Sequence, residues 1–131
     1  MIALDTNVLL RALVDDETAP EQCAAARRLI ESEGAVSIGA VVFVEAMWTL
    51  SRSYGYGRMQ VARVARLLLE HPKYRVRSAD LLAGAVARYE RAGIDFADAI
   101  ALEDARSERT ALHTFDRKLA RQDGAQLVAA A

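Results

Sequence analysis

Cysteine and histidine are nearly missing from this sequence. Cys23 is the only cysteine, so the chain can form no internal disulfide and no cysteine cluster that binds a metal ion. His71 and His113 are the only histidines, and neither belongs to an HExxH sequence or to a serine or cysteine arrangement that implies a triad. We therefore expect an intracellular, cytoplasmic protein whose chemistry uses other side chains.

Long apolar runs and an excess of positive charge are also lacking. Residues 34–51 have the fewest charges, but Glu45 interrupts them and their length is marginal, so we expect no membrane span. Asp5 and Arg11 break the apolar start, and no signal peptide is predicted. With 17 Lys and Arg against 18 Asp and Glu, the net charge is −1, so nucleic-acid binding would need a local basic patch.

The pattern that is present alternates short apolar runs with longer helical segments. With 131 residues, 53% of them hydrophobic, one globular domain over residues 1–131 is expected. Strands are predicted near residues 1–4, 35–38, 74–77, 111–115 and 126–129. Helices are predicted over residues 8–13, 21–33, 40–54, 59–70, 79–92 and 96–106. This order predicts an α/β fold with a mainly parallel sheet covered by helices.

Helical periodicity also predicts which side chains enter the core. In the helix over residues 21–33 the inner face is expected to be Ala25, Ala26, Leu29 and Ile30. In the helix over residues 59–70 it is expected to be Val61, Val64, Leu67 and Leu68. Cys23 is expected to be a small buried side chain.

Glu45 stands out because its sequence neighbours are apolar. It is the only charged residue between Glu33 and Arg52, in a helix that is apolar nearly all round, which is typical of a buried helix. An ionised carboxylate there is costly unless it is paired or binds a metal. Two interpretations stay open: a metal-site residue, or a buried glutamate held by Arg52 or by backbone donors.

Asp98 lies in the first turn of a predicted helix that Asp95 is expected to cap. At the third helical position a carboxylate commonly caps the helix and interacts favourably with its dipole. Asp98 nevertheless shares a face with Ile94 and Leu102, which predicts that it points inward. A cap and a functional acid are both compatible with this position.

Asp5 and Asp116 each follow a predicted strand and precede a helix, where a helix cap is the ordinary role. Acids at the ends of two parallel strands can also face the same sheet edge, where α/β proteins bind ligands. We hypothesise that Asp5, Glu45, Asp98 and Asp116 converge. Clustered carboxylates need a cation to stay ionised, and a site with oxygen ligands alone favours Mg²⁺ or Mn²⁺ over zinc.

Four segments carry a resemblance to a known family. They are LDTNVL at residues 4–9, Glu45 in its apolar helix, GIDFADA at residues 93–99 and TFDR at residues 114–117. In their order and spacing the chain resembles the PIN-domain nucleases, and most closely the VapC-type toxins of bacterial toxin–antitoxin pairs. The resemblance covers essentially the whole chain. It implies a PIN-like single domain in which a parallel sheet of about five strands lies between helices.

The resemblance also implies roles for individual residues. The catalytic acidic quartet would be Asp5, Glu45, Asp98 and Asp116. Asp5 and Asp98 would be the principal metal ligands, with Asp116 assisting directly or through water. Thr6, Asn7 and Thr114 would order the pocket. The cofactor implied is Mg²⁺, with Mn²⁺ as a possible substitute, and the partners implied are an RNA substrate, a second copy of the chain in a homodimer, and a cognate antitoxin.

The leading hypothesis is a Mg²⁺-dependent endoribonuclease. Metal held by the acids would activate water and offset charge on the phosphoryl oxygens, and either Glu45 or Asp116 would help to take the water's proton. Arginines such as Arg11 and Arg52, each about two turns after an acid of interest, are candidates to line a substrate path.

Two other classes of function stay open. A phospho-acceptor receiver domain also places acids and Mg²⁺ at strand ends, but it needs paired acids directly after the first strand and a lysine after a late strand. Here Asp15 and Asp16 lie beyond a helix, and Lys118 follows an aspartate. A non-catalytic interaction module would bind a basic partner through the same acids and would show no nuclease activity with any divalent metal.

Overall fold

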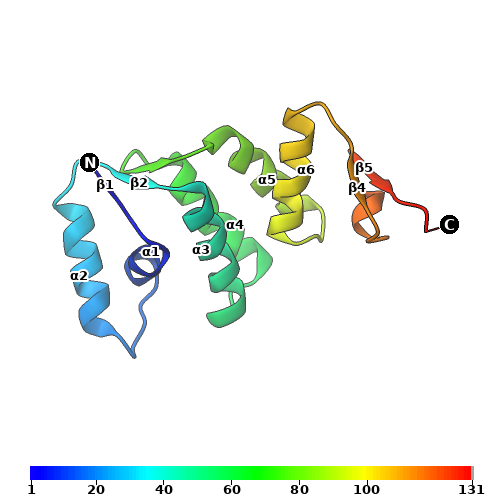
Figure 1. The fold of residues 1–131 in the computed structure, drawn as a ribbon. Helices are drawn as coiled ribbons and strands as arrows, with labels where there is room; N and C mark the ends of the chain where they lie inside the picture. Colours follow the sequence, from blue (N-terminus) through cyan, green and yellow to red (C-terminus); the bar gives the residue numbers. More distant parts are fainter. Residues whose placement is uncertain (131) are drawn as a thin grey trace. The chain divides into compact units, whose positions relative to one another are not determined.

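Helices and parallel strands alternate in the computed structural model, which describes residues 1–130 (Figure 1). The chain divides into two compact units, Met1–Ala79 and Asp80–Ala131. The first unit contains β1 (Ile2–Ala3), α1 (Thr6–Leu13), α2 (Pro20–Glu31), β2 (Val36–Ile38), α3 (Ala40–Ser53), α4 (Arg58–Glu70) and β3 (Tyr74–Val76). From the unit boundary onward come α5 (Ala79–Arg91), α6 (Phe96–Ser107), β4 (Leu112–Thr114), the 3₁₀ helix η1 (Leu119–Arg121) and β5 (Ala125–Leu127).

The first unit is built on a parallel sheet with strand order β1-β2-β3. Ile2 pairs with Val36, and Val36 pairs in turn with Tyr74. Two helices connect each strand to the next, α1 with α2 and then α3 with α4, because parallel neighbours need a long crossover. Within this unit α1 packs against α2 and α3, and α3 packs against α4.

Buried aliphatic and aromatic side chains hold the first unit together. Both outer residues of β2, Val36 and Ile38, have no exposed surface, as expected for a strand covered by helices. The helices contribute Leu9, Phe43, Met47, Leu50, Val61 and Leu68, all with at most 1% of their surface exposed. Burial of such side chains supplies the main favourable free energy of folding.

The second unit contains a two-stranded parallel sheet of β4 and β5 and a buried ion pair between α5 and α6. Arg88 Nε donates to Glu103 Oε1 at 3.1 Å, and the two side chains are 5% and 12% exposed. A guanidinium nitrogen of Arg88 also donates to the backbone oxygen of Asp123, 3.1 Å away. Gly84 allows this close approach, since a Cβ there would lie 2.8 Å from a carboxylate oxygen of Glu103.

The α/β class with parallel strands and flanking helices is confirmed. The five strands match the expected number, but their hydrogen bonds divide them into a sheet of three and a sheet of two, one in each unit. The predicted elements match the observed ones closely. Within residues 1–130, no helix has the length and apolar character needed to cross a membrane.

Three expectations about helix faces are wrong. Ala25 and Leu29 in α2 are exposed, whereas Cys23, Ala26 and Ile30 are buried. In α4, Leu67 is 49% exposed, while the small residues Ala62 and Ala65 face inward with Val61 and Leu68. In α4 as many residues are buried as predicted, but the buried face is shifted toward two alanines, whose small side chains allow close packing.

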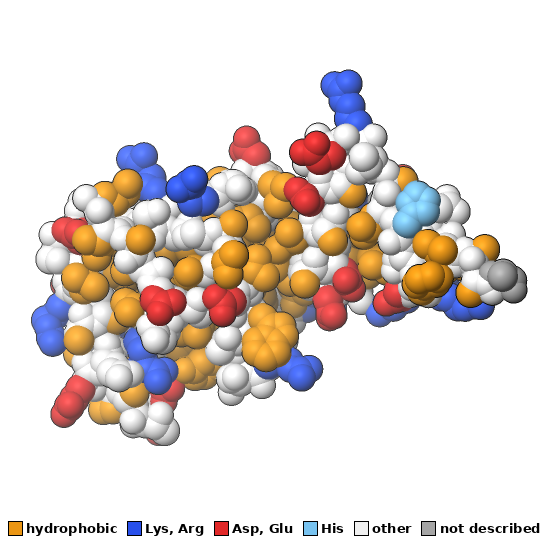
Figure 2. Space-filling model, viewed as in Figure 1, with side chains coloured by type: hydrophobic (Ala, Val, Ile, Leu, Met, Phe, Trp, Pro, Cys, Tyr) orange, Lys and Arg blue, Asp and Glu red, His pale blue; other side chains and the backbone are white. Residues whose placement is uncertain are grey.

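The expectation that α3 is buried on all sides is also wrong. Val41 is 70% exposed and Trp48 is 59% exposed, while Phe43, Met47 and Leu50 on the opposite face are buried. Figure 2 shows apolar side chains at the surface of the molecule among acidic and basic ones.

Candidate active site

The first candidate acid, Asp5, lies where β1 ends and α1 begins. Its backbone is extended, with φ −78° and ψ 162°, and it occupies the cap position of α1. Oxygen Oδ1 accepts a hydrogen bond from the backbone N–H of Thr6 at 2.7 Å. The side chain is exposed, so its second oxygen is accessible to a ligand.

Glu45 in α3 is connected to the same corner through Thr6. The Thr6 hydroxyl Oγ1 donates to Glu45 Oε1 at 3.2 Å, across 39 positions of sequence. Glu45 is exposed rather than buried, so the expectation of a costly buried charge is wrong, as is a pairing with Arg52. The reason is that α3 presents this face outward. Thr6 therefore brings Asp5 and Glu45 to one corner of the first unit.

The other two candidate acids, Asp98 and Asp116, line one cavity of about 140 Å³ in the second unit. Asp95 and Lys118 line it as well. Asp95 occupies the cap position of α6, as predicted, but its side chain makes no capping hydrogen bond. From the sequence, Asp95 was expected only to cap the helix. Its spacing of three residues from Asp98 is the signal that could have placed it beside Asp98.

Asp98 is half-buried, as its helical face predicted. Burial raises the pKa of its carboxyl above the ordinary value, and the negative charges of Asp95 and Asp116 raise it further. These three effects all penalise a negative charge at Asp98. A cation bound in the cavity would reverse the penalty, because an opposite charge favours the ionised carboxylate.

Asp116 is held by a tight turn after β4. Its Oδ1 accepts backbone N–H bonds from Lys118 at 2.9 Å and Leu119 at 3.0 Å. Its own N–H donates to Thr114 Oγ1 at 3.0 Å. These bonds engage one carboxylate oxygen and leave Oδ2 available. Thr114 thus orders the backbone at Asp116, whereas Thr6 bonds directly to a carboxylate.

Asn7, the remaining predicted pocket residue, has a different environment. It is exposed in the first turn of α1 and lines a cavity of about 430 Å³ together with Arg11, Gln22 and Leu29. Throughout residues 1–130, no hydrogen bond connects its side chain to one of the four acids.

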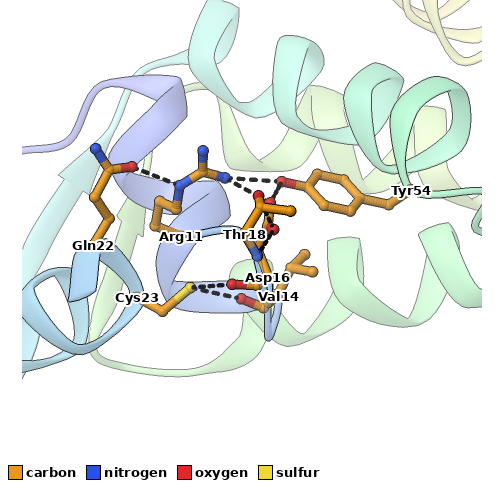
Figure 3. Close-up of polar contacts among 7 residues, drawn as sticks. All are labelled: Arg11, Val14, Asp16, Thr18, Gln22, Cys23 and Tyr54. Carbon is orange, nitrogen blue, oxygen red and sulfur yellow. Dashed lines mark hydrogen bonds and ion pairs between the residues drawn. The ribbon is translucent and has the colours of Figure 1, made fainter. Parts of the chain in front are cut away.

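A polar network joins α1 to the end of α3 through Asp16 (Figure 3). A guanidinium nitrogen of Arg11 donates to Asp16 Oδ2 at 3.1 Å and to the Tyr54 hydroxyl at 2.9 Å. That hydroxyl in turn donates to Asp16 Oδ2 at 2.9 Å. Hydrogen bonds from the hydroxyl and backbone N–H of Thr18, then the Tyr54 hydroxyl, lower the pKa of the Asp16 carboxyl, although partial burial opposes them. Arg11, expected near a substrate path, is thus engaged in holding the two helices.

The four acids divide equally between the two units, Asp5 and Glu45 in the first and Asp98 and Asp116 in the second. All their donor atoms are carboxylate oxygens, which fits Mg²⁺ or Mn²⁺ and does not fit a soft metal. Among residues 1–130, no group of three or more His, Cys, Asp or Glu side chains is arranged as a ready metal cluster.

Comparison with known proteins places the chain in a family. The family model for the PIN domain matches residues 2–125. No curated protein gives a match to the sequence. The family match covers both units and includes all four candidate acids. PIN domains are generally nucleases that use divalent metal ions, and this chain belongs to the PIN domain family.

Proposed function

We propose that the chain is a Mg²⁺-dependent endoribonuclease whose catalytic quartet is Asp5, Glu45, Asp98 and Asp116. The observation that carries the proposal is the pairing of a strand-end aspartate with a helical acid in each unit: Asp5 with Glu45 through Thr6, and Asp116 with Asp98 around one cavity. One family model that spans residues 2–125 supports the further proposal that both units form a single nuclease domain.

The metal ligands in this proposal are Asp5, Asp98 and Asp116, with Mn²⁺ as a substitute for Mg²⁺. Such an ion, when bound, supplies a polarised water and neutralises charge on the phosphoryl oxygens. Support comes from the donor atoms, which are carboxylate oxygens, and from the environment of Asp98, where burial and two like charges favour a bound cation.

The chain's own residues account for the proton transfer. Glu45 is exposed, and Thr6 fixes one of its oxygens at 3.2 Å, leaving the other to accept a proton from the attacking water. Asp116 is the alternative base, because its Oδ1 is occupied by two backbone N–H groups while Oδ2 is available. Lys118, which lines the cavity with Asp98 and Asp116, is placed to neutralise a phosphate oxygen.

We further propose that the nuclease is the toxin of a type II toxin–antitoxin pair, a cytoplasmic homodimer inhibited by a cognate antitoxin. The order and spacing of the four motif segments support this assignment. Its direct test is expression in a bacterial host. Wild type should arrest growth, and co-expression of a short reading frame encoded next to this gene should relieve the arrest; continued growth of the wild-type strain would contradict the toxin role.

The test of the enzymatic proposal compares Asp5→Asn and Asp98→Asn with Asp104→Asn, an exposed acid on the same helix as Asp98. Cleavage of cellular RNA is measured with Mg²⁺, with Mn²⁺ and after chelation. Asp5→Asn and Asp98→Asn should remove metal-dependent cleavage while circular dichroism shows a folded protein, and Asp104→Asn should cleave normally. Full cleavage by both Asp5→Asn and Asp98→Asn would disprove the mechanism.

A further inference from the structure

Four side chains share the outward face of α3. Val41, Glu45, Trp48 and Arg52 recur at intervals of three or four residues, which aligns them along one side of a helix. All four are exposed. Trp48 is 59% exposed, unusually open for a tryptophan. The outward face of α3 therefore presents an aromatic ring one turn along the helix from the proposed catalytic Glu45.

Arg52, four residues after Trp48, contacts the Trp48 ring. Its guanidinium carbon lies 5.5 Å from the centroid of the Trp48 ring, within the range of a cation–π contact. In the part of the chain that the structure describes, Arg52 forms no ion pair with a carboxylate. Its N–H groups therefore keep their capacity to bind an anion. The result is a flat aromatic surface with an accessible cation at one end.

We propose that Trp48 and Arg52 form a nucleotide-binding platform, in which an unpaired RNA base stacks on Trp48 and a neighbouring phosphate binds Arg52. This inference rests on the proposed function, because it places the base next to the phosphate on which Glu45 acts. Proteins bind single-stranded RNA through aromatic rings and arginine planes that stack with bases, together with cations that follow the phosphates. The platform would favour single-stranded substrates over duplexes, whose bases are already stacked.

A second copy of the chain is the other possible occupant of this face. Three features argue for RNA instead. Protein interfaces are depleted of charged residues at their centre, whereas here Glu45 lies between Val41 and Trp48. A protein seated on this face would also cover Glu45, which the proposed reaction needs open to substrate. The positive charge of Arg52 complements a polyanion.

Trp48 is the only tryptophan, so its fluorescence reports on this platform alone. Asp5→Asn protein, which should bind RNA without cleaving it, is titrated with single-stranded oligoribonucleotides of mixed sequence and with the matching duplex. We expect saturable quenching by the single strand and weaker quenching by the duplex. Arg52→Ala should weaken binding and reduce its salt dependence, because one phosphate contact is lost.

Cleavage kinetics provide the second measurement. Trp48→Ala should raise KM for single-stranded RNA by roughly 5- to 150-fold, the equivalent of one lost base stack, with a smaller change in kcat. Trp48→Phe should restore most of the loss, since it keeps an aromatic face. Met59→Ala is the matched control, because Met59 is also 59% exposed and lies outside α3. The control should leave KM unchanged, and equal melting temperatures should show that all variants are folded.

The outcomes separate this inference from the function on which it rests. If wild type shows metal-dependent cleavage and Trp48→Ala binds and cleaves RNA equally well, the platform is overturned and the nuclease stands. Absence of cleavage by wild type, with Trp48 still quenched by single-stranded RNA, would overturn the nuclease and leave the platform. A fluorescence change that follows protein concentration instead of RNA, with a smaller oligomer for Trp48→Ala, would assign this face to contact between copies and overturn the inference.

Discussion

The two units hold their acid pairs in contrasting ways. Asp5 and Glu45 are both exposed, and Thr6 donates to both, through its backbone N–H to Asp5 and through its hydroxyl to Glu45. Asp98 is half-buried beside other acids, and its pKa is raised by burial and by Asp95 and Asp116. The first pair is thus open to solvent. In the proposed function, a cation bound beside the second pair would offset the effects that penalise a negative charge at Asp98.

The ion pairs of the two units also differ in how far their side chains are exposed. In the first unit Arg11 and Asp16 are 27% and 16% exposed and share their bond with Tyr54. In the second unit Arg88 and Glu103 are 5% and 12% exposed. Loss of one partner from a buried ion pair leaves a charge without water, whereas a partly exposed group can regain hydration. Stability of the second unit should therefore depend more on its ion pair.

The largest expected effect comes from breaking that ion pair. Arg88→Met should reduce the free energy of unfolding by about 3–5 kcal/mol, because Glu103 keeps its charge in a buried site. Arg106, 4.0 Å from Glu103 and 73% exposed, can replace little of the contact. Denaturant unfolding measures the loss.

Two further variants make this test specific. Arg88→Met with Glu103→Leu should recover most of the stability, because no buried charge remains. Arg27→Met removes an exposed pair with Asp15, whose side chains are 44% and 89% exposed, and should have the smallest effect of the three. Equal losses for Arg88→Met and Arg27→Met would show that burial does not control the contribution of these pairs.

Thr6→Val, which removes the hydroxyl but keeps the shape, tests the first pair. If Glu45 acts on substrate, loss of its orienting bond should lower kcat/KM by about 10- to 100-fold, as for other residues that orient a catalytic side chain. Thr114→Val should cost less, because Thr114 bonds to the backbone of Asp116 and not to its carboxylate.

The control for this comparison is Thr49→Val. Its hydroxyl donates to the backbone oxygen of Glu45 at 2.8 Å, so the substitution removes a threonine bond next to Glu45 without freeing the carboxylate. The pH–rate profile is measured for both variants. Normal activity of Thr49→Val together with a loss in Thr6→Val would show that the effect comes from the orientation of Glu45 and not from general stability. A Thr6→Val enzyme as active as wild type would disprove the orienting role.

The sequence was sufficient for the order of elements and for the acids at their ends. Short apolar runs separated by glycine, proline and capping residues mark strand and helix limits, so Asp5 and Asp95 were correctly placed at helix starts. The inward face of Asp98 also followed from helical spacing. These features depend on local order, which one sequence carries directly.

The exposed face of α3 was beyond prediction for a physical reason. A helix that is apolar nearly all round has no polar stripe to mark its outer side, so Trp48 and Glu45 were both expected to be buried. The ion pair of Arg88 with Glu103 was missed for another reason. Its partners lie 15 residues apart on two helices, so no local pattern pairs them, and charged residues are normally on the surface.

The smallest expected effect concerns the network at Asp16 and depends on pH. Because the pKa of Asp16 is lower in the folded chain than its ordinary value of 3.8, folding favours the ionised carboxylate. Its stabilising contribution is complete above that ordinary value and is lost as the pH falls through the lower, folded value. The difference in unfolding free energy between wild type and Asp16→Asn should therefore be constant from pH 7 to about 5 and shrink below about pH 4.

Unfolding curves at several pH values check this expectation, and Tyr54→Phe sharpens it. Loss of the Tyr54 hydroxyl removes one of the bonds that lower the pKa of Asp16, so the pH dependence should weaken without disappearing, because Thr18 still donates two. A difference between wild type and Asp16→Asn that stays constant to pH 3 would contradict the network's electrostatic role. Because the Asp16 network joins α1 to the end of α3, the same low-pH loss should accompany looser coupling between α1, which Asp5 caps, and α3, which carries Glu45.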